Sequence, residues 1–143
     1  MEIKSVFVDA NIFIDFGDEK RDTKQISFQI LNYLLKNKIT IYTSCDLITT
    51  IYYILSKNDK QIALNTIEYI NKMVTIIDFS NKELLQIINL MREDNNFKDL
   101  EDTIQYVLAK NTSCDLIISN DKGFYSPDIE LVSGDVFVEK LEI

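Results

Sequence analysis

Short apolar strands alternate with amphipathic helices along almost the whole chain of 143 residues, and this alternation limits the possible folds more than any other feature. Residues 4–8, with the sequence KSVFV, are apolar and β-branched, as expected for a buried parallel strand. Residues 22–38 instead carry apolar side chains at helical spacing. Such alternation predicts an α/β fold, with three α/β/α layers around a central, mainly parallel sheet.

Turn and capping residues divide the rest of the chain into further elements. Ser80 and Glu83 form a capping-box pattern ahead of an apolar helix. Asp15 and the charged residues 18–22 are predicted to lie in a solvated loop. The other predicted strands are 39–44, 74–79, 115–119 and 129–133, and the other predicted helices are 46–57, a segment after Asn58 or Asp59, 99–111, and a short segment after Gly134.

The composition excludes several kinds of catalysis. Without any histidine, the chain cannot form a Ser-His-Asp or Cys-His arrangement, and Cys45 and Cys114 match no zinc-binding spacing. The net charge of −8 argues against a broad basic surface for nucleic acid, although a bound cation reverses the charge of an acidic cluster. No apolar run approaches the roughly 20 residues of a membrane span. We expect a single cytoplasmic domain over residues 1–143.

Polar side chains follow several of the predicted strands, at the sheet edge where ligands bind in parallel α/β proteins. The ends of parallel strands share that edge, so these side chains are expected to meet in one cleft. The set comprises Asp9 and Asn11 after the first strand, Ser44 after the second, Ser119, Asn120 and Asp121 after the fourth, and Asp99 and Asp102 at the start of the helix before the fourth strand.

Several carboxylates in one cleft repel each other and must be neutralised by protons or by a cation. Oxygen ligands without histidine or thiolate suit Mg²⁺ or Mn²⁺, which can activate a bound water and polarise a phosphoryl oxygen. Asp9, Asp102 and Asp121 would form the minimal metal site, with Asp99 on the same helix face as Asp102. Each residue alone also fits a structural role, because an aspartate often caps a turn or a helix.

These segments resemble the motifs of the PIN domain family, the nuclease fold of many prokaryotic toxin–antitoxin toxins, over essentially the whole chain. FVDANIFID resembles the first motif and TSCDLITTIYYILSK the second, while DLEDTIQYVLAKNTSCDLIISNDKGF resembles the third and fourth. The resemblance implies that Asp9, Asp102 and Asp121 are the catalytic metal ligands. It implies supporting roles for Asn11, Asp99, Asn120, Ser119, Ser44 and Thr50.

The second motif lacks the acid that the family carries there. Alignment of the motif places Thr49 or Thr50 at that position, and neither hydroxyl supplies the charge of a carboxylate. Asp46 lies about one helical turn earlier and is the nearest acid in this segment. The change removes one negative charge from the expected site.

The resemblance implies a VapC-like, metal-dependent endoribonuclease that uses Mg²⁺ or Mn²⁺. RNA would be the substrate, and a cognate antitoxin and a second copy of the chain are the partners that the family allows. Because the acidic set is incomplete, the alternative is a catalytically weakened or inactive module that binds RNA or protein. A phosphatase of the haloacid dehalogenase type is a further alternative, but Ser119 and Lys122 are too close in sequence to come from separate elements.

Overall fold

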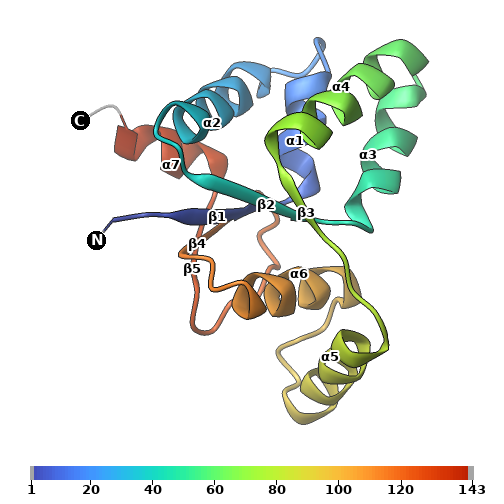
Figure 1. Ribbon diagram of the computed structural model, residues 1–143, viewed down its shortest axis with the longest axis vertical. Coiled ribbons are helices and arrows are strands. Elements are labelled where there is room, and N and C mark those ends of the chain that lie inside the picture. The colour runs from blue at the N-terminus through green and yellow to red at the C-terminus, as the bar shows by residue number, and fades with distance from the viewer. Residues whose placement is uncertain (1, 142–143) are drawn as a thin grey trace.

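Residues 2–141, which the computed structural model describes, form a five-stranded sheet between two layers of helices (Figure 1). Every strand pair is parallel, so the predicted α/β/α fold is confirmed. The predicted domain limits, residues 1 and 143, lie outside the described residues. The strand order is β3-β2-β1-β4-β5, with β1 at Ser5–Val8, β2 at Thr40–Ser44, β3 at Thr75–Ile77, β4 at Leu116–Ile118 and β5 at Glu130–Val132.

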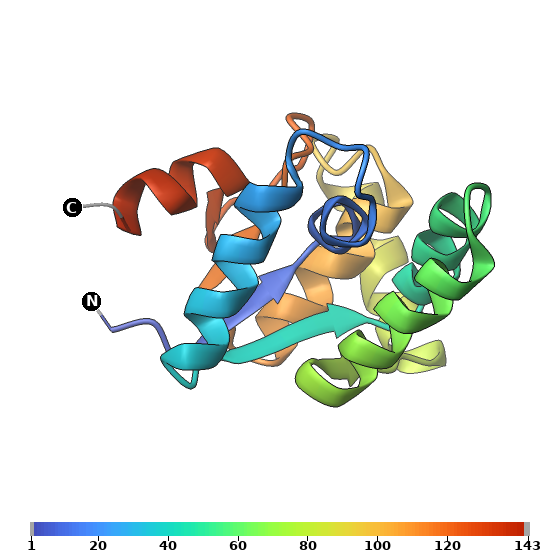
Figure 2. The same cartoon turned by 90° about the horizontal axis from the view of Figure 1, so that it is seen from above.

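The helices divide unequally between the two faces of the sheet (Figures 1 and 2). The larger layer contains α1 (Ala10–Gly17), α2 (Lys24–Lys36), α3 (Leu47–Ser56), α4 (Lys60–Met73) and α7 (Gly134–Leu141). On the opposite face, α6 (Leu100–Asn111) packs on β1 and β2, and α5 (Asn81–Glu93) packs on α6. No helix within residues 2–141 is both long enough and apolar enough to cross a membrane.

The central strand β1 carries the chain directly into the candidate site. Val6, Phe7 and Val8 are fully buried, as expected for a strand with neighbours on both edges and helices on both faces. Val8 pairs with Ile118, the last residue of β4. The residues that follow these two strands are therefore neighbours in space although 110 positions separate them in sequence.

The structure contains a helix, α1, that was not predicted from the sequence. Its residues Ile12, Phe13 and Ile14 are consecutive and all buried, because the helix packs between α2, α3 and α4. A helix in which six of eight residues are buried shows no continuous polar face, so hydrophobic periodicity does not reveal it. The predicted solvated loop is also wrong at Asp15, which is 4% exposed and accepts a hydrogen bond from Arg21 Nη1 at 2.8 Å.

Most of the other predicted elements agree with the structure to within a few residues. The capping box before α5 is confirmed, with the Ser80 N–H donating to the Glu83 carboxylate at 2.8 Å. Asp99 is the N-cap of α6, and its Oδ1 accepts from the N–H of Glu101 at 3.1 Å. The capping hydrogen bond uses only Oδ1 of Asp99, so Oδ2 does not take part in it.

Candidate metal centre

Asp9 lies at the point where β1 ends and α1 begins. Its side chain is the N-cap of α1, with Oδ1 accepting from the Ala10 N–H at 2.6 Å, and Oδ2 accepts from the Ser119 hydroxyl at 2.7 Å. The Asp9 N–H donates to the carbonyl of Ile118 at 3.0 Å, so the ends of β1 and β4 are joined through both backbone and side chain. The buried carboxylate, only 4% exposed, is therefore held in one orientation.

The start of α6 supplies two further carboxylates. Asp99 is the exposed N-cap, and Asp102, one turn into the helix, is 9% exposed. Their spacing of three residues places both side chains on one side of the helix start. The positive end of the helix dipole favours negative charge at both positions.

Asp121 follows β4 and completes the group. Its N–H donates to the Ser119 hydroxyl at 3.1 Å, and its Oδ1 accepts from the Gly123 N–H at 2.9 Å. The buried Ser119 hydroxyl connects the two acids, because it donates to Asp9 and accepts from the Asp121 N–H. The turn that follows β4 therefore fixes the positions of two predicted site acids, Asp9 and Asp121, relative to each other.

Asp99, Asp102 and Asp121 each place one carboxylate oxygen within 4.8 Å of the others. A hollow of about 10 Å³, about the size of one water molecule, is lined by Asp99 and Asp102. Asp9 is adjacent to this group rather than within it. No ion pair within residues 2–141 involves any of these four acids.

The acids of this site have raised pKa values, as expected for buried carboxylates without a basic partner. The pKa of Asp102 is raised to about 8, first by burial, then by a hydrogen bond with Asp121 and by the charges of Asp121, Asp99 and Asp9. Burial also raises the pKa of Asp9, and the charge of Asp121 adds to this, against the opposing effect of its hydrogen bonds. Both groups are unfavourable as anions in the protein alone.

A divalent cation fits this donor set. All the converging groups are carboxylates, and hard oxygen ligands of this kind are those that Mg²⁺ and Mn²⁺ prefer. A cation among the acids would remove the mutual repulsion that raises the pKa of Asp102. The prediction that Asp9, Asp102 and Asp121 are the metal ligands stays a prediction, to which the geometry adds Asp99.

Several predicted supporting residues are placed differently from the acids. Asn11 is exposed on the first turn of α1. The Asn120 side chain accepts from the Gly134 N–H at 2.8 Å, so it anchors the start of α7. The Thr49 hydroxyl donates to the carbonyl of Asp46 at 3.1 Å, while Thr50 is half-buried on α3. Neither threonine provides a carboxylate.

Two residues of α6 near the site were not predicted from the sequence. Gln105 is fully buried and close enough to Asp9 to favour its ionised form, yet neither of its amide atoms has a hydrogen-bond partner within the described residues 2–141. Glu101 has a raised pKa, caused first by burial and then by the charges of Asp46 and Asp9. Gln105 could have been recognised in the sequence as a polar residue within the otherwise apolar segment 104–109.

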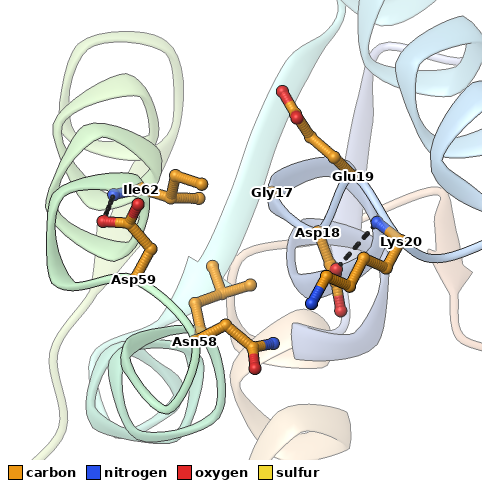
Figure 3. A pocket seen from close by; sticks show the side chains of 8 residues that line it. Gly17, Asp18, Glu19, Lys20, Asn58, Asp59 and Ile62 are labelled. Atoms are coloured by element: carbon orange, nitrogen blue, oxygen red, sulfur yellow. Dashed lines mark hydrogen bonds between the residues drawn. The ribbon is translucent and has the colours of Figure 1, made fainter.

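A separate pocket of about 240 Å³ lies at the other end of α1, against the turn between α3 and α4 (Figure 3). Gly17 and Asp18 line one side of it, and Leu55, Asn58 and Ile62 line the other. Asp9 caps the opposite end of α1, about 12 Å away for a helix of eight residues. This pocket is therefore distinct from the acidic cluster.

Residues 5–123, from the start of β1 to the turn after Asp121, match the family model of the PIN domain. The chain belongs to the PIN domain family. This PIN domain is 51% identical over 140 residues to ribonuclease VapC1 of Aquifex aeolicus (strain VF5), a match that covers 98% of this chain and 97% of that protein. The acidic cluster therefore lies within the part of the chain that defines the family.

Solved structures share the PIN fold at much lower sequence identity. VapBC2 from Rickettsia felis, bound to a DNA fragment from its promoter, has a TM-score of 0.70 and 21% identity and covers 90% of this chain and 98% of that chain. VapC20 of Mycobacterium tuberculosis, described as a sarcin-ricin loop cleaving toxin, has a TM-score of 0.68 and 13% identity and covers 87% of this chain and 95% of that chain. These similarities show a VapC-like fold.

Proposed function

We propose that this PIN domain is a metal-dependent endoribonuclease and the toxin of a toxin–antitoxin pair. The observation that carries the proposal is the convergence of Asp99, Asp102 and Asp121, with Asp9 beside them and without a basic partner among residues 2–141. A protein that is 51% identical and bears the name ribonuclease supports RNA as the substrate. Acidic clusters without counter-ions are costly to fold, which favours a role that recruits a cation.

In this proposal, Asp102, Asp121 and Asp99 hold Mg²⁺ or Mn²⁺, together with Asp9. When bound, the cation supplies a water of lowered pKa and polarises a phosphoryl oxygen of the RNA. The Ser119 hydroxyl orients Asp9, and the Gly123 N–H fixes one oxygen of Asp121. Positioning of this kind keeps the carboxylates in place while their protons are exchanged for the metal.

The proposed partners follow from the same comparisons. A cognate antitoxin is supported by the similarity to the VapBC2 structure and to a toxin–antitoxin complex from Klebsiella pneumoniae, which has a TM-score of 0.69. We further propose that the protein acts in the cytoplasm and forms a homodimer. Lys122 follows Asp121 directly and is exposed, which suits a contact to an RNA phosphate beside the acids.

The test is cleavage of structured RNA in the presence of Mn²⁺ by the wild type, Asp9→Ala and Asp102→Ala. The proposal predicts cleavage by the wild type that disappears in EDTA and in both variants. Equal cleavage by all three proteins would show that the nuclease site lies elsewhere. Folding of each variant is checked by circular dichroism.

The same experiment decides between the nuclease and a binding module without catalysis. Such a module is favoured by Thr49 and Thr50, because the resemblance to the family leads us to expect a carboxylate at one of these two positions. If the wild type binds RNA but does not cut it at any Mn²⁺ or Mg²⁺ concentration, the binding module is correct and the nuclease proposal is wrong.

A further inference from the structure

An aromatic cluster formed by Phe97, Tyr106 and Tyr125 lies beside the acidic group. Phe97 is 5% exposed and lies in the connection between α5 and α6, two residues before Asp99. Its ring centroid is 4.7 Å from that of Tyr125, with an angle of 76° between the ring planes, and 5.2 Å from that of Tyr106. Phe97 therefore packs between a residue of α6 and a residue of the segment that follows β4.

The contact between Phe97 and Tyr125 joins the two chain segments that carry the converging acids. Asp99 and Asp102 follow Phe97 at the start of α6, whereas Asp121 precedes Tyr125 by four residues. Both aromatic residues also line the water-sized hollow that Asp99 and Asp102 line. The ring contact thus forms part of the wall of the hollow at which the carboxylates converge.

The segment after Asp121 is attached to α6 at a second point. The Tyr106 hydroxyl donates to the Asp128 carboxylate, and the Lys110 ammonium pairs with the same carboxylate. Tyr106 is only 3% exposed, so its ring offers a fixed surface to Phe97 as well as a fixed donor to Asp128. The chain that leaves the site at Asp121 is therefore held against α6 through both Tyr125 and Asp128.

The acids themselves do not provide a dependable attraction between these segments, because ionised carboxylates repel each other. Yet Mg²⁺ binds oxygens at about 2.0–2.1 Å and tolerates little deviation from octahedral geometry. The oxygens of Asp99, Asp102 and Asp121 lie within 4.8 Å of one another, so a small separation of the two segments would take them out of reach of one ion. An edge-to-face aromatic contact is attractive whatever the charge state of the acids.

We propose that Phe97 is a positioning residue, which through Tyr125 holds Asp121 opposite Asp99 and Asp102 at the separation that a divalent cation requires. This inference rests on the proposed metal-dependent function and extends it to residues outside the acidic set. Phe97 acts through the acids rather than by contact with the metal. Loss of its ring would leave the hydrogen bonds within each segment in place, but would loosen the two segments relative to each other.

The test is calorimetric titration of Mn²⁺ into metal-free wild type, Phe97→Leu and Phe137→Leu. Phe137 is the matched control, because it is 4% exposed and its ring packs edge-to-face on Tyr33, with centroids 5.9 Å apart. It lines a different pocket together with Leu116, which lies at the opposite end of β4 from Asp121.

We expect both variants to lower the melting temperature of the metal-free protein to a similar extent. Only Phe97→Leu should also raise the Kd for Mn²⁺, by about tenfold, the size typical of disturbing an indirect partner of a metal site. If Phe97 served stability alone, neither variant would change the Kd of the folded protein. That result would overturn the positioning role while the nuclease proposal stands.

A second pair of variants tests the same contact from the partly buried Tyr125, so the test does not depend on the folding of Phe97→Leu. Tyr125→Leu removes the ring and should raise the Kd about tenfold, whereas Tyr125→Phe keeps the ring and should stay within about threefold of the wild type. Wild-type affinity in Tyr125→Leu, or equal weakening in both variants, would overturn the role of the ring contact. If the wild type itself bound no Mn²⁺, the proposed function would fail and the inference with it.

Discussion

Asp9 and Asp15 are two aspartates at either end of the short helix α1, and both are 4% exposed. Asp15 pairs with Arg21, whose Nη1 lies 2.8 Å from its Oδ1. Asp9 accepts hydrogen bonds from Ser119 and Ala10 but has no basic partner in the described part of the chain, and burial raises its pKa. The protein thus neutralises the charge of Asp15 through Arg21 but does not neutralise the charge of Asp9, although both aspartates are equally buried.

This contrast separates structural acids from acids that are available for a ligand. A buried carboxylate with its own guanidinium is already satisfied and has no reason to bind a cation. A buried carboxylate surrounded by other carboxylates needs protons or a metal. Burial alone therefore does not distinguish Asp9 from Asp15, whereas the presence of a basic partner does.

The largest expected effect comes from exchanging each acid for its amide. Asp9→Asn should lower the rate of Mn²⁺-dependent RNA cleavage by more than about 100-fold, because even the outer partners of metal ligands are worth 10- to 100-fold. Asp15→Asn should keep the rate per folded molecule within a few-fold of the wild type. The rates are measured on a labelled RNA. If both variants lost activity equally, the contrast between the two acids would have no functional meaning.

Asp15→Asn should instead lower the free energy of unfolding, by about 1–2 kcal/mol, because Arg21 loses its charged partner but stays partly in water. Urea unfolding of the metal-free protein measures this loss. Asp18→Asn is the control, since Asp18 contacts the same arginine at 3.3 Å on a more exposed surface and should cost less than about 1 kcal/mol. The reverse order would contradict the assignment of Asp15 as the structural partner.

The pH dependence of stability tests the unneutralised acids. Asp102 has a pKa of about 8 in the folded protein against an ordinary value of 3.8, so between these values the folded state binds more protons than the unfolded chain. Stability of the metal-free protein should therefore be highest at low pH within this window and fall as pH rises toward 8. Asp102→Asn should flatten the fall. Urea unfolding at pH 5, 6, 7 and 8 provides the measurement, and identical slopes in both proteins would contradict it.

The smallest predicted effect concerns the hydroxyl that joins Asp9 to Asp121. Ser119→Ala should cost about 1 kcal/mol of stability and weaken Mn²⁺ binding about tenfold. Ser126→Ala is the matched control, because its hydroxyl donates to the carbonyl of Ile129 at 2.6 Å outside the acidic cluster. The control should lose comparable stability without any change in Mn²⁺ affinity. Equal affinities in the two variants would show that Ser119 has only a structural role.

Much of the fold was predictable because most strands and helices carry clear local signals. The strand KSVFV, the helix 22–38 and the capping box at Ser80 follow from apolar patterning and capping chemistry, and the structure agrees with all three. Helix α1 was missed since burial of most of its residues removes the polar face that a periodic pattern needs. Asp15 was missed with it, because a partner six residues away cannot be recognised without the path of the chain.

The candidate site was predictable where its acids directly follow strands or start a helix, as Asp9, Asp102 and Asp121 do. Glu101 and Gln105 were not predicted, because their significance depends on which face of α6 turns toward β1 and β2. The supporting role of Asn120 stays a prediction, and its hydrogen bond from the Gly134 N–H could not be foreseen because it depends on how α7 returns to the sheet. Sequence spacing thus locates the acids, while helix orientation decides which neighbours act with them.

The most direct measurement is calorimetric titration of Mn²⁺ into metal-free wild type, Asp102→Asn and Asp15→Asn at pH 8. The central claim is that the acids without a basic partner form a cation site, while an equally buried but paired acid does not contribute to it. Binding by the wild type and Asp15→Asn, with none by Asp102→Asn, is the predicted result. Binding to Asp102→Asn as tight as to the wild type would contradict the claim.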